Sequence, residues 1–215
     1  MSSTRPSLPA RRTVVVATGN RGKLRELSAL LSHLPIDLVS SAEAAGRVVE
    51  VIEDGDTFEA NAQKKAREVA AITAMPTLAD DSGLEVDALA GRPGVRSARY
   101  ARQGATDAEN NTKLLGELET LGAVTARSAR FRCVIAFVDP TDPAASIEAS
   151  GACEGAIASS PRGHAGFGYD PIFLVAATSF ERTMAELSDD EKSRLSHRAM
   201  AIAALDPALR RWLAR

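Results

Sequence analysis

Residues 13–39 read TVVVATGNRGKLRELSALLSHLPIDLV, and this stretch decides the fold class. The β-branched run 13–17 is typical of a buried strand, and it breaks at the polar sequence TGN. Leucines at helical spacing follow, and Pro35 ends the helix that they predict. A second strand over 36–39 completes a strand–loop–helix–strand unit. We therefore expect an α/β fold.

The rest of the chain continues the mixture of strands and helices. We expect further strands at 77–79, 131–138, 147–158 and 172–175, with 84–89 extended or turning. Long helices are expected from Asp56 or Thr57 to about Ile72, over 106–121 and over 186–204, with a last turn or two over 207–213. No interdomain linker interrupts these elements. We expect one domain over 13–215, preceded by a flexible extension over 1–12.

Composition excludes several classes of protein. The 215 residues are 45% hydrophobic and 25% charged, which is ordinary globular usage and rules out global disorder. A net charge of −2 argues against a broadly basic protein that binds nucleic acid. No apolar run approaches the ~20 residues that cross a bilayer, and the basic N-terminus lacks the apolar stretch of a secretory signal. We expect no membrane contact and a cytoplasmic protein.

The first candidate site is the loop TGNRGK, which lies between the first strand and the first helix. Its glycines allow backbone N–H groups to approach an anion, and the helix N-terminus adds positive potential. Lys23 supplies a point charge, and it is one of only 5 lysines beside 21 arginines. The loop is not a Walker A motif, because Leu24 follows the lysine. A plain strand-to-helix turn explains the loop equally well.

The second candidate is acidic: Glu53, and the adjacent pair Asp80 and Asp81. Adjacent carboxylates at the end of a strand repel each other unless a cation lies between them. Oxygen ligands suit Mg²⁺, which takes one or two carboxylates together with substrate phosphates. A turn with solvated acidic residues is the more common explanation for an isolated Asp-Asp pair.

The third candidate is the loop 163–170, GHAGFGYD, in which three glycines alternate with two aromatic residues. Such a loop can present a ring to a planar base. A hairpin turn with core aromatics is the alternative.

The last candidate is Lys192 with Ser196-His197-Arg198 on the expected late helix. Lys192 and Ser196 lie four residues apart, so they are predicted to share a helix face.

No single one of these motifs identifies a protein family, but the set of motifs in this order does. The blocks TGNxGK, ExGxTF with NAxxKA, ADDSGLxVDAL, GFGYDPIF and EKSxxSHRxxA resemble those of the inosine/xanthosine triphosphate pyrophosphatase family. The resemblance covers about Thr13 to Leu205. It implies an ITPase-like α/β fold with a long mixed central sheet flanked by helices, and two lobes with the active-site cleft between them. It also implies a Mg²⁺-dependent homodimer that hydrolyses non-standard purine nucleotides such as ITP, dITP and XTP to the monophosphate and pyrophosphate.

The resemblance assigns roles to particular residues. Glu53 and Asp81 correspond to metal ligands, and Asp81 also to the proton acceptor, with Asp80 a close second candidate. Substrate contacts fall on the phosphate loop, on a lysine near the phosphates, on a serine after the aspartates, on the base loop and on the late helix: Thr18, Gly19, Asn20, Arg21, Gly22, Lys23, Lys65, Ser82, Phe167, Gly168, Tyr169, Asp170, Lys192, His197 and Arg198.

Discrimination between purines has a physical basis. Hypoxanthine and xanthine carry a 6-oxo acceptor where adenine carries a 6-amino donor. If Arg198 and a protonated His197 direct donors to that position, adenine leaves them unpaired in a dry pocket, which rejects it strongly. Guanine shares the 6-oxo group, and the sequence names no residue that rejects its 2-amino group.

Two other functions remain open at the sequence level. A pyrophosphatase of related fold could act on other modified nucleotides, such as pyrimidine triphosphates, although the His-Arg pair favours purines. A non-catalytic nucleotide-binding protein is the second alternative. Such a protein has no need of a carboxylate that activates water, so the intact acidic group argues for an enzyme.

Overall fold

The structure is a computed structural model that describes residues 11–121 and 124–215. Within them, one sheet contains β1 (Arg12–Val16), β2 (Ile36–Ser40), β3 (Thr77–Val86), β4 (Ser128–Asp139), β5 (Asp142–Ile157) and β6 (Phe173–Val175). The α-helices are α1 (Arg21–Leu30), α2 (Ser41–Ala45), α3 (Phe58–Thr73), α4 (Asp107–Glu117), α5 (Asp189–Leu195) and α6 (His197–Leu213). Short 3-10 helices are η1 (Asp87–Leu89), η2 (Gly94–Arg99), η3 (Val124–Arg127), η4 (Asp170–Ile172), η5 (Ala176–Thr178) and η6 (Met184–Glu186).

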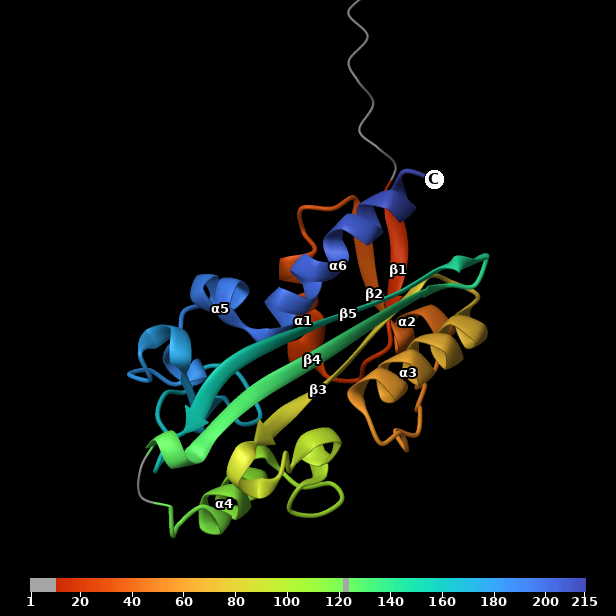
Figure 1. Cartoon of the computed structure of the whole chain (residues 1–215). Coiled ribbons are helices and arrows are strands. Elements are labelled where there is room, and N and C mark those ends of the chain that lie inside the picture. The colour runs from red at the N-terminus through yellow and green to blue at the C-terminus, as the bar shows by residue number, and fades with distance from the viewer. Residues whose placement is uncertain (1–10, 122–123) are drawn as a thin grey trace, which may run out of the picture.

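The sheet is mixed, in the order β2-β1-β3-β4-β5-β6. β1 pairs in parallel with both β2 and β3, while β3, β4, β5 and β6 pair antiparallel in turn. The strands β3, β4 and β5 are much longer than β1 and β2 and run past them to one side (Figure 1). The expected mixed α/β architecture is confirmed.

Helices cover both faces of the sheet where β1, β3 and β4 lie together. One face packs against α1 and α6 in the first core cluster, around Val16, Leu27 and Leu205. The other face packs against α3 in a second cluster, around Val15, Ala66 and Val134. Because Val15 and Val16 are neighbours on one strand, they reach opposite faces. Figure 1 shows α3 on one side of the long strands and α1 and α6 on the other.

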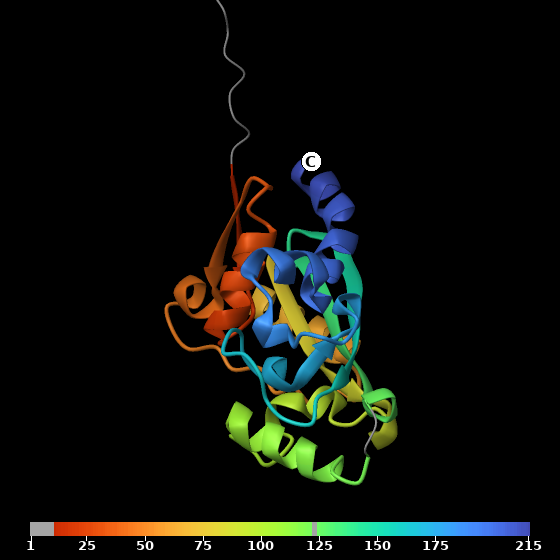
Figure 2. The same ribbon diagram turned by 90° about the vertical axis from the view of Figure 1, so that its left-hand side faces the viewer.

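A third group of buried side chains, here called the distal cluster, lies at the far end of the long strands. It includes Leu84, Leu114, Phe131, Tyr169 and Phe173. The segment between β3 and β4, which carries η2 and α4, contributes to it and lies beyond the carboxyl end of β3 (Figure 1). Figure 2 shows this green segment below α1, with the cyan chain that follows β5 between the two.

The acidic segment differs from its prediction. A brief strand at 77–79 was expected to end in a turn at Asp80, but β3 continues without a break to Val86. Asp81 pairs with Val134 of β4 in the middle of the ladder. The backbone bonds to β4 therefore outweigh the poor strand preference of consecutive aspartates.

The late helix also differs. The range 186–204 was expected to be one helix, but η6 ends at Glu186 and a helix boundary falls at Ser196. Ser196 has extended backbone angles and caps α6, because its side chain accepts a hydrogen bond from the N–H of Ala199. Ser196 also ends α5, one turn after Lys192, and both residues line the same cavity, as their spacing predicted. The helix expected over 106–121 ends at Glu117, and α2 was not predicted.

The first strand begins one residue earlier than expected. β1 begins at Arg12, which pairs with Ile36, so the expected boundary of the extension falls one residue late. Arg11 also donates to the Asp37 carboxylate, at 2.7 Å. Residues 1–10 of the expected extension lie outside the described residues. Among the helices of the described ranges, none has both the length and the apolar character needed to span a bilayer.

Candidate functional site

Asp80 and Asp81 are neighbours on β3, so their side chains point to opposite faces of the sheet. Asp80 faces α1 and α6, and Asp81 faces α3. The expectation that the pair repels unless one cation lies between them is wrong. Each carboxylate has its own cationic partners. Those of Asp80 come from α1 and α6, and that of Asp81 comes from α3.

Asp80 is the centre of a buried ion network. Its Oδ2 lies 3.0 Å from Nη2 of Arg198 and 3.1 Å from Nζ of Lys23. Burial alone opposes ionisation, but Lys23 and Arg198 outweigh it, and the pKa of Asp80 is lowered. Arg198 also donates to Ser82 Oγ, at 3.1 Å, and to the carboxylate of Glu26. Oδ2 of Asp80 therefore holds two cations in place, while its buried Oδ1 has no hydrogen-bond partner among the described residues.

Asp81 lies in a second, more open compartment. Nζ of Lys65 donates to Oδ1 of Asp81, at 3.1 Å, and to Oε1 of Glu53, at 2.7 Å. Burial raises the pKa of Asp81, with Lys65 acting against that rise. Burial also disfavours the Lys65 ammonium, but Asp81, Asp80 and Glu53 prevail and raise its pKa. The result is a strongly ionic contact between a loop, a helix and a strand.

Asn61 completes this compartment, and no role was predicted for it. Its Nδ2 donates to Oδ2 of Asp81, at 3.2 Å, and its Oδ1 accepts the N–H of Gly55, at 2.8 Å. The amide thereby fixes the loop that carries Glu53 relative to β3. Arg99 holds the same loop from η2 by donating to the carbonyl oxygen of Glu53, at 3.1 Å. The spacing NAxxKA was the available signal, since Asn61 and Lys65 are four residues apart on one helix.

The donors around Lys65 are compatible with Mg²⁺. Glu53 and Asp81 come from different elements and direct carboxylate oxygens to one point, now taken by the Lys65 ammonium. Mg²⁺ prefers oxygen ligands and is commonly held by one or two carboxylates with substrate phosphates. In residues 11–121 and 124–215, His, Cys, Asp and Glu form no group of three that could hold a metal alone.

The phosphate loop is arranged differently from the expectation. The side chain of Asn20 caps α1, because its Oδ1 accepts the N–H groups of Gly22, at 2.8 Å, and Lys23, at 3.2 Å. The N–H of Asn20 donates to Thr18 Oγ1, at 3.1 Å. Three of the loop N–H groups are thus satisfied internally, and Lys23 carries the main positive charge. Arg21 is exposed at the start of α1.

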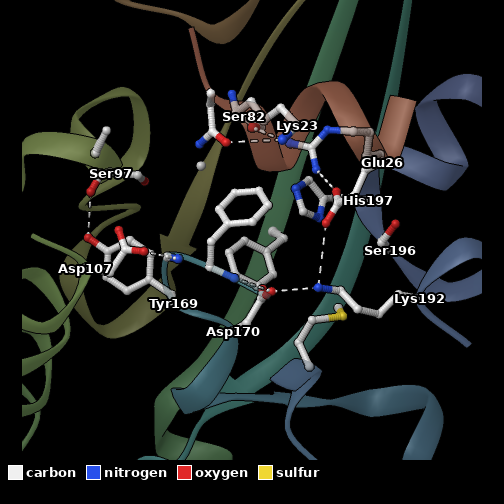
Figure 3. A pocket seen from close by; sticks show the side chains of 18 of the residues that line it. Lys23, Glu26, Ser82, Ser97, Asp107, Tyr169, Asp170, Lys192, Ser196 and His197 are labelled. Carbon is white, nitrogen blue, oxygen red and sulfur yellow. Dashed lines mark hydrogen bonds and ion pairs between the residues drawn. The ribbon is translucent and has the colours of Figure 1, made fainter. Parts of the chain in front are cut away.

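An aromatic cavity of about 140 Å³ lies on the other side of Lys23 (Figure 3). Asp170, Lys192 and His197 line it, with Lys192 Nζ 2.8 Å from Oδ2 of Asp170. Burial raises the pKa of Asp170, although Lys192 opposes that shift. In Figure 3, Lys192 and Glu26 lie to one side of the cavity, and Ser97 and Asp107 to the other.

The two aromatic residues of the base loop have different roles. The Phe167 ring lies 5.9 Å from Cζ of Arg198 and closes against the first turn of α1 at Gly22. Tyr169 is buried in the distal cluster and donates to the carbonyl oxygen of Ser97, at 2.8 Å. Both residues line the cavity, and Tyr169 also packs in the distal cluster, so both interpretations of the loop hold in part.

The expectation that His197 is protonated is wrong. Its ring is buried at the start of α6 and stacks on Phe131, with ring centroids 4.9 Å apart. Burial, followed by the positive charge of Arg198, lowers the pKa of His197 well below its usual value. The imidazole is neutral at pH 7, so it carries one N–H donor and one acceptor.

The compartment around Asp81 and the aromatic cavity adjoin each other. A cavity of about 290 Å³ contains Glu53, Lys65 and Asp81, and it shares the lining residues Asn20, Lys23, Ser82 and Ala98 with the aromatic cavity. Of the predicted site residues, Arg21 lines neither cavity, and Gly22 reaches only a neighbouring hollow beside α5. Lining residues that the sequence reasoning missed are Glu26, Ser97, Asp107, Asn110 and Met184. A ligand with an anionic end and a planar ring fits across both cavities.

Comparisons with known proteins agree with this geometry. The model of the Ham1 family matches residues 14–208. A protein of Geobacter sulfurreducens named dITP/XTP pyrophosphatase is 52% identical over 89% of this chain and 94% of its own length. One of the same name from Syntrophobacter fumaroxidans is 50% identical over 89% of this chain and 79% of its own. The structure of a HAM1 protein from Coxiella burnetii matches with a TM-score of 0.82 and 44% identity, over 93% of this chain and 99% of that one.

Proposed function

The chain belongs to the Ham1 family, and from that membership we propose that it is a nucleoside triphosphate pyrophosphatase for non-standard purine nucleotides. Its substrates are ITP, dITP and XTP, which it cleaves to the nucleoside monophosphate and pyrophosphate. The activity removes these nucleotides from the pool that polymerases use.

One observation carries the proposal: an ionic cavity and an aromatic cavity meet at Lys23. The ionic side offers Lys23 and Lys65 to a polyphosphate, and the aromatic side offers the Phe167 ring to a planar base. Stacking on an aromatic ring contributes ~1–3 kcal/mol per base, and cations compensate phosphate charge. One nucleotide therefore satisfies both cavities at once.

We propose that Glu53 and Asp81 hold Mg²⁺ together with substrate phosphates. The convergence of both carboxylates on the Lys65 ammonium supports this assignment, since an oxygen of each lies within 3.1 Å of one nitrogen. When bound, Mg²⁺ supplies charge neutralisation to the phosphates. Lys65 then pairs with phosphate oxygens in place of one of its carboxylate partners.

Asp81 is the proton acceptor in this proposal. The water that attacks the α-phosphorus loses a proton, and Asp81 is the buried carboxylate on the side where the phosphates lie. Burial raises its pKa, which makes it a stronger base than an exposed aspartate, while Lys65 favours the ionised form. Asn61 fixes the orientation of the carboxylate through Oδ2. Asp80, the second candidate, is the weaker base, because Lys23 and Arg198 bind its Oδ2 and lower its pKa.

Recognition of the 6-oxo group falls to neutral His197 and to Arg198. The imidazole N–H of His197 and the one guanidinium hydrogen of Arg198 that is not used by Asp80, Ser82 or Glu26 are the donors that we assign to this recognition. Adenine has an amino donor at this position, which would face the donors of His197 and Arg198. The protein donors and the amino group would then all lack an acceptor. This account needs no positive charge on His197.

The decisive measurement is the product released from ITP, XTP, dITP, dATP and dGTP, with Mg²⁺ and with EDTA. We expect pyrophosphate from the first three, little from dATP and dGTP, and none with EDTA. Asp81→Asn removes the proton acceptor and is expected to lower kcat by about 10²–10⁴-fold.

Asp54→Asn is the matched control, because Asp54 lies beside Glu53 in sequence but is exposed and pairs with Lys64. It should keep wild-type turnover. Release of orthophosphate would overturn attack at the α-phosphorus. Tight ITP binding without turnover would identify a non-catalytic nucleotide-binding protein instead.

Three further assignments complete the proposal, the first from the family resemblance and the other two from the charge and hydrophobicity of the sequence. We propose a homodimer, a cytoplasmic location, where nucleoside triphosphates are abundant, and no partnership with nucleic acid or membrane. Light scattering tests the first of these, since a dimer has twice the 22.7 kDa mass of one chain.

A further inference from the structure

The helix α4 reaches the base loop from the other side of the aromatic cavity and contacts one residue there, Gly168. Oδ2 of Asp107 accepts the N–H of Gly168, at 2.7 Å. Nδ2 of Asn111 donates to the carbonyl oxygen of the same residue, at 3.1 Å. Both backbone polar groups of Gly168 are therefore bound by side chains of a single helix.

The geometry of this contact follows from the helix repeat. Asp107 and Asn111 are four residues apart, so they lie on one face of α4, one turn from each other. Gly168 has a φ of +63°, a left-handed conformation that glycine adopts without a steric penalty. In that conformation, its N–H and carbonyl group both meet the helix face. We call the pair Asp107 and Asn111 the Gly168 clamp.

The residues on either side of Gly168, Phe167 and Tyr169, line the aromatic cavity. The N–H of Phe167 donates to Oδ2 of Asp170, at 3.2 Å, and Asp170 in turn binds Lys192. Tyr169 is anchored to η2 through Ser97. The direction of the Phe167 ring thus depends on a backbone segment whose central residue is held by α4.

The clamp is not needed to hold α4 itself. Leu114 and Leu118 are fully buried in the distal cluster and anchor the helix there. The side chain of Asn111 is buried, and within the described residues its Oδ1 has no hydrogen-bond partner. Leaving a buried acceptor unpaired costs ~1–3 kcal/mol, so stability alone does not account for an asparagine at this position.

We propose that Asp107 and Asn111 are positioning residues, which hold Gly168 so that Phe167 and Asp170 are preorganised to receive a purine base. The proposal rests on the proposed function of the same site. Neither residue lines the ionic cavity, so we expect their effect to be on base affinity. Preorganisation lowers the ordering cost of binding and therefore acts on KM more than on kcat.

The test compares Asp107→Ala with Asp107→Asn. Both variants remove the negative charge near the N-terminus of α4, but the asparagine keeps an oxygen that accepts the N–H of Gly168. For Asp107→Ala we expect KM for ITP to rise about tenfold, with kcat within about twofold of wild type. Asp107→Asn should restore most of the affinity. Asn111→Asp, which places an acceptor against the Gly168 carbonyl, should raise KM at least as much as Asp107→Ala.

Product inhibition separates the base site from the phosphate site. Inhibition by IMP should weaken about tenfold in Asp107→Ala, while inhibition by pyrophosphate stays unchanged. Thr112→Ala is the matched control, because Thr112 is exposed on α4 beside Asn111. It should leave KM and kcat at wild-type values.

A second readout does not depend on turnover. The amide hydrogen of Gly168 should exchange with solvent at least tenfold faster in Asp107→Ala than in wild type or in Asp107→Asn. If the wild-type protein cleaves no purine nucleotide, the proposed function fails, and this exchange measurement still tests the clamp. Unchanged exchange, or equal losses in Asp107→Ala and Asp107→Asn with a matching drop in melting temperature, would overturn the positioning role.

Discussion

Two adjacent residues show how strongly local surroundings decide chemistry. Asp80 and Asp81 have the same side chain, but strand alternation places one beside two cations and the other in a partly open compartment. The pKa of Asp80 is lowered by Lys23 and Arg198, which overcome burial, and the pKa of Asp81 is raised by burial. Consecutive aspartates thus have pKa values shifted in opposite directions.

His197 provides a prediction of pH-dependent stability. Burial and the nearby cations Arg198, Lys23 and Lys192 lower its pKa in the folded state, and only Asp80 opposes them. The unfolded chain, with a pKa near 6.5, therefore takes up a proton first as the pH falls. The free energy of unfolding should be unaffected above about pH 7. Below pH 6.5 it should fall by up to about 1.4 kcal/mol per pH unit from this residue.

Urea unfolding at pH 7.5, 6.5 and 5.5 measures this contribution as the difference in slope between wild type and His197→Gln. The variant should lose the part of the acid destabilisation that belongs to His197. His164→Gln is the control, because that side chain is exposed. Identical pH slopes for wild type and His197→Gln would show that the imidazole is not held neutral.

At the scale of elements, the contact between α6 and β5 sets the position of His197 and Arg198. Gly151 of β5 lies directly beneath the start of α6, and a Cβ there would fall on backbone atoms of His197, Met200 and Ala201. Backbone cannot rotate away as a flexible side chain can, so the helix itself has to move.

Gly151→Ala should therefore shift α6 outward and act on both stability and affinity. We expect the free energy of unfolding to fall by about 1–3 kcal/mol and KM for ITP to rise several-fold. Thermal unfolding and steady-state kinetics measure the two effects. Gly116→Ala in α4 is the counterpart, since a Cβ there meets no atom within 4 Å and alanine favours a helix by about 0.5–1 kcal/mol. A fully stable, fully active Gly151→Ala variant would contradict this role of the glycine.

Sequence patterns predicted some elements well and others poorly, for physical reasons. The opening strand–loop–helix–strand unit was found because periodicity and Pro35 are local signals. The continuation of β3 through Asp80 was missed because pairing with β4 is a long-range contact. The break at Ser196 had a local signal, a serine that can cap a helix, but hydrophobic periodicity on both sides concealed it.

The candidate site was predictable by residue type more than by arrangement. The five blocks indicated Lys23, Lys65 and Asp81 in advance, because the chemistry of phosphate and metal binding needs those groups. The separation of Asp80 from Asp81 and the neutral state of His197 depend on burial, which the sequence does not display. Asp107 and Asn111 bind backbone groups of a distant segment, so only the fold reveals them, whereas the spacing NAxxKA was a local signal for Asn61.

At the scale of the whole molecule, the long strands join two hydrophobic regions. β3 contributes Leu78 to the first core cluster and Leu84 to the distal cluster, and β4 likewise contributes Phe137 and Phe131. Each strand would have to unfold in its middle for one region to melt alone. We therefore propose that the residues from β1 to α6 fold as one cooperative unit, as expected for a single domain.

Leu114→Ala tests this proposal from the distal side. Leu114 is 0% exposed, and truncation of such a residue costs about 2–5 kcal/mol. The single tryptophan, Trp212, lies in the first core cluster and reports the opposite end of the molecule. If the molecule is one unit, the Trp212 fluorescence transition in urea moves to lower concentration together with the far-UV circular dichroism transition.

Leu209→Ala is the control, because it truncates a residue of the same core as Trp212. Its effect on the Trp212 midpoint shows how large a shift a truncation within that core produces. A Trp212 transition that keeps its wild-type midpoint in Leu114→Ala, with an earlier loss of circular dichroism, would mean that the distal region unfolds separately.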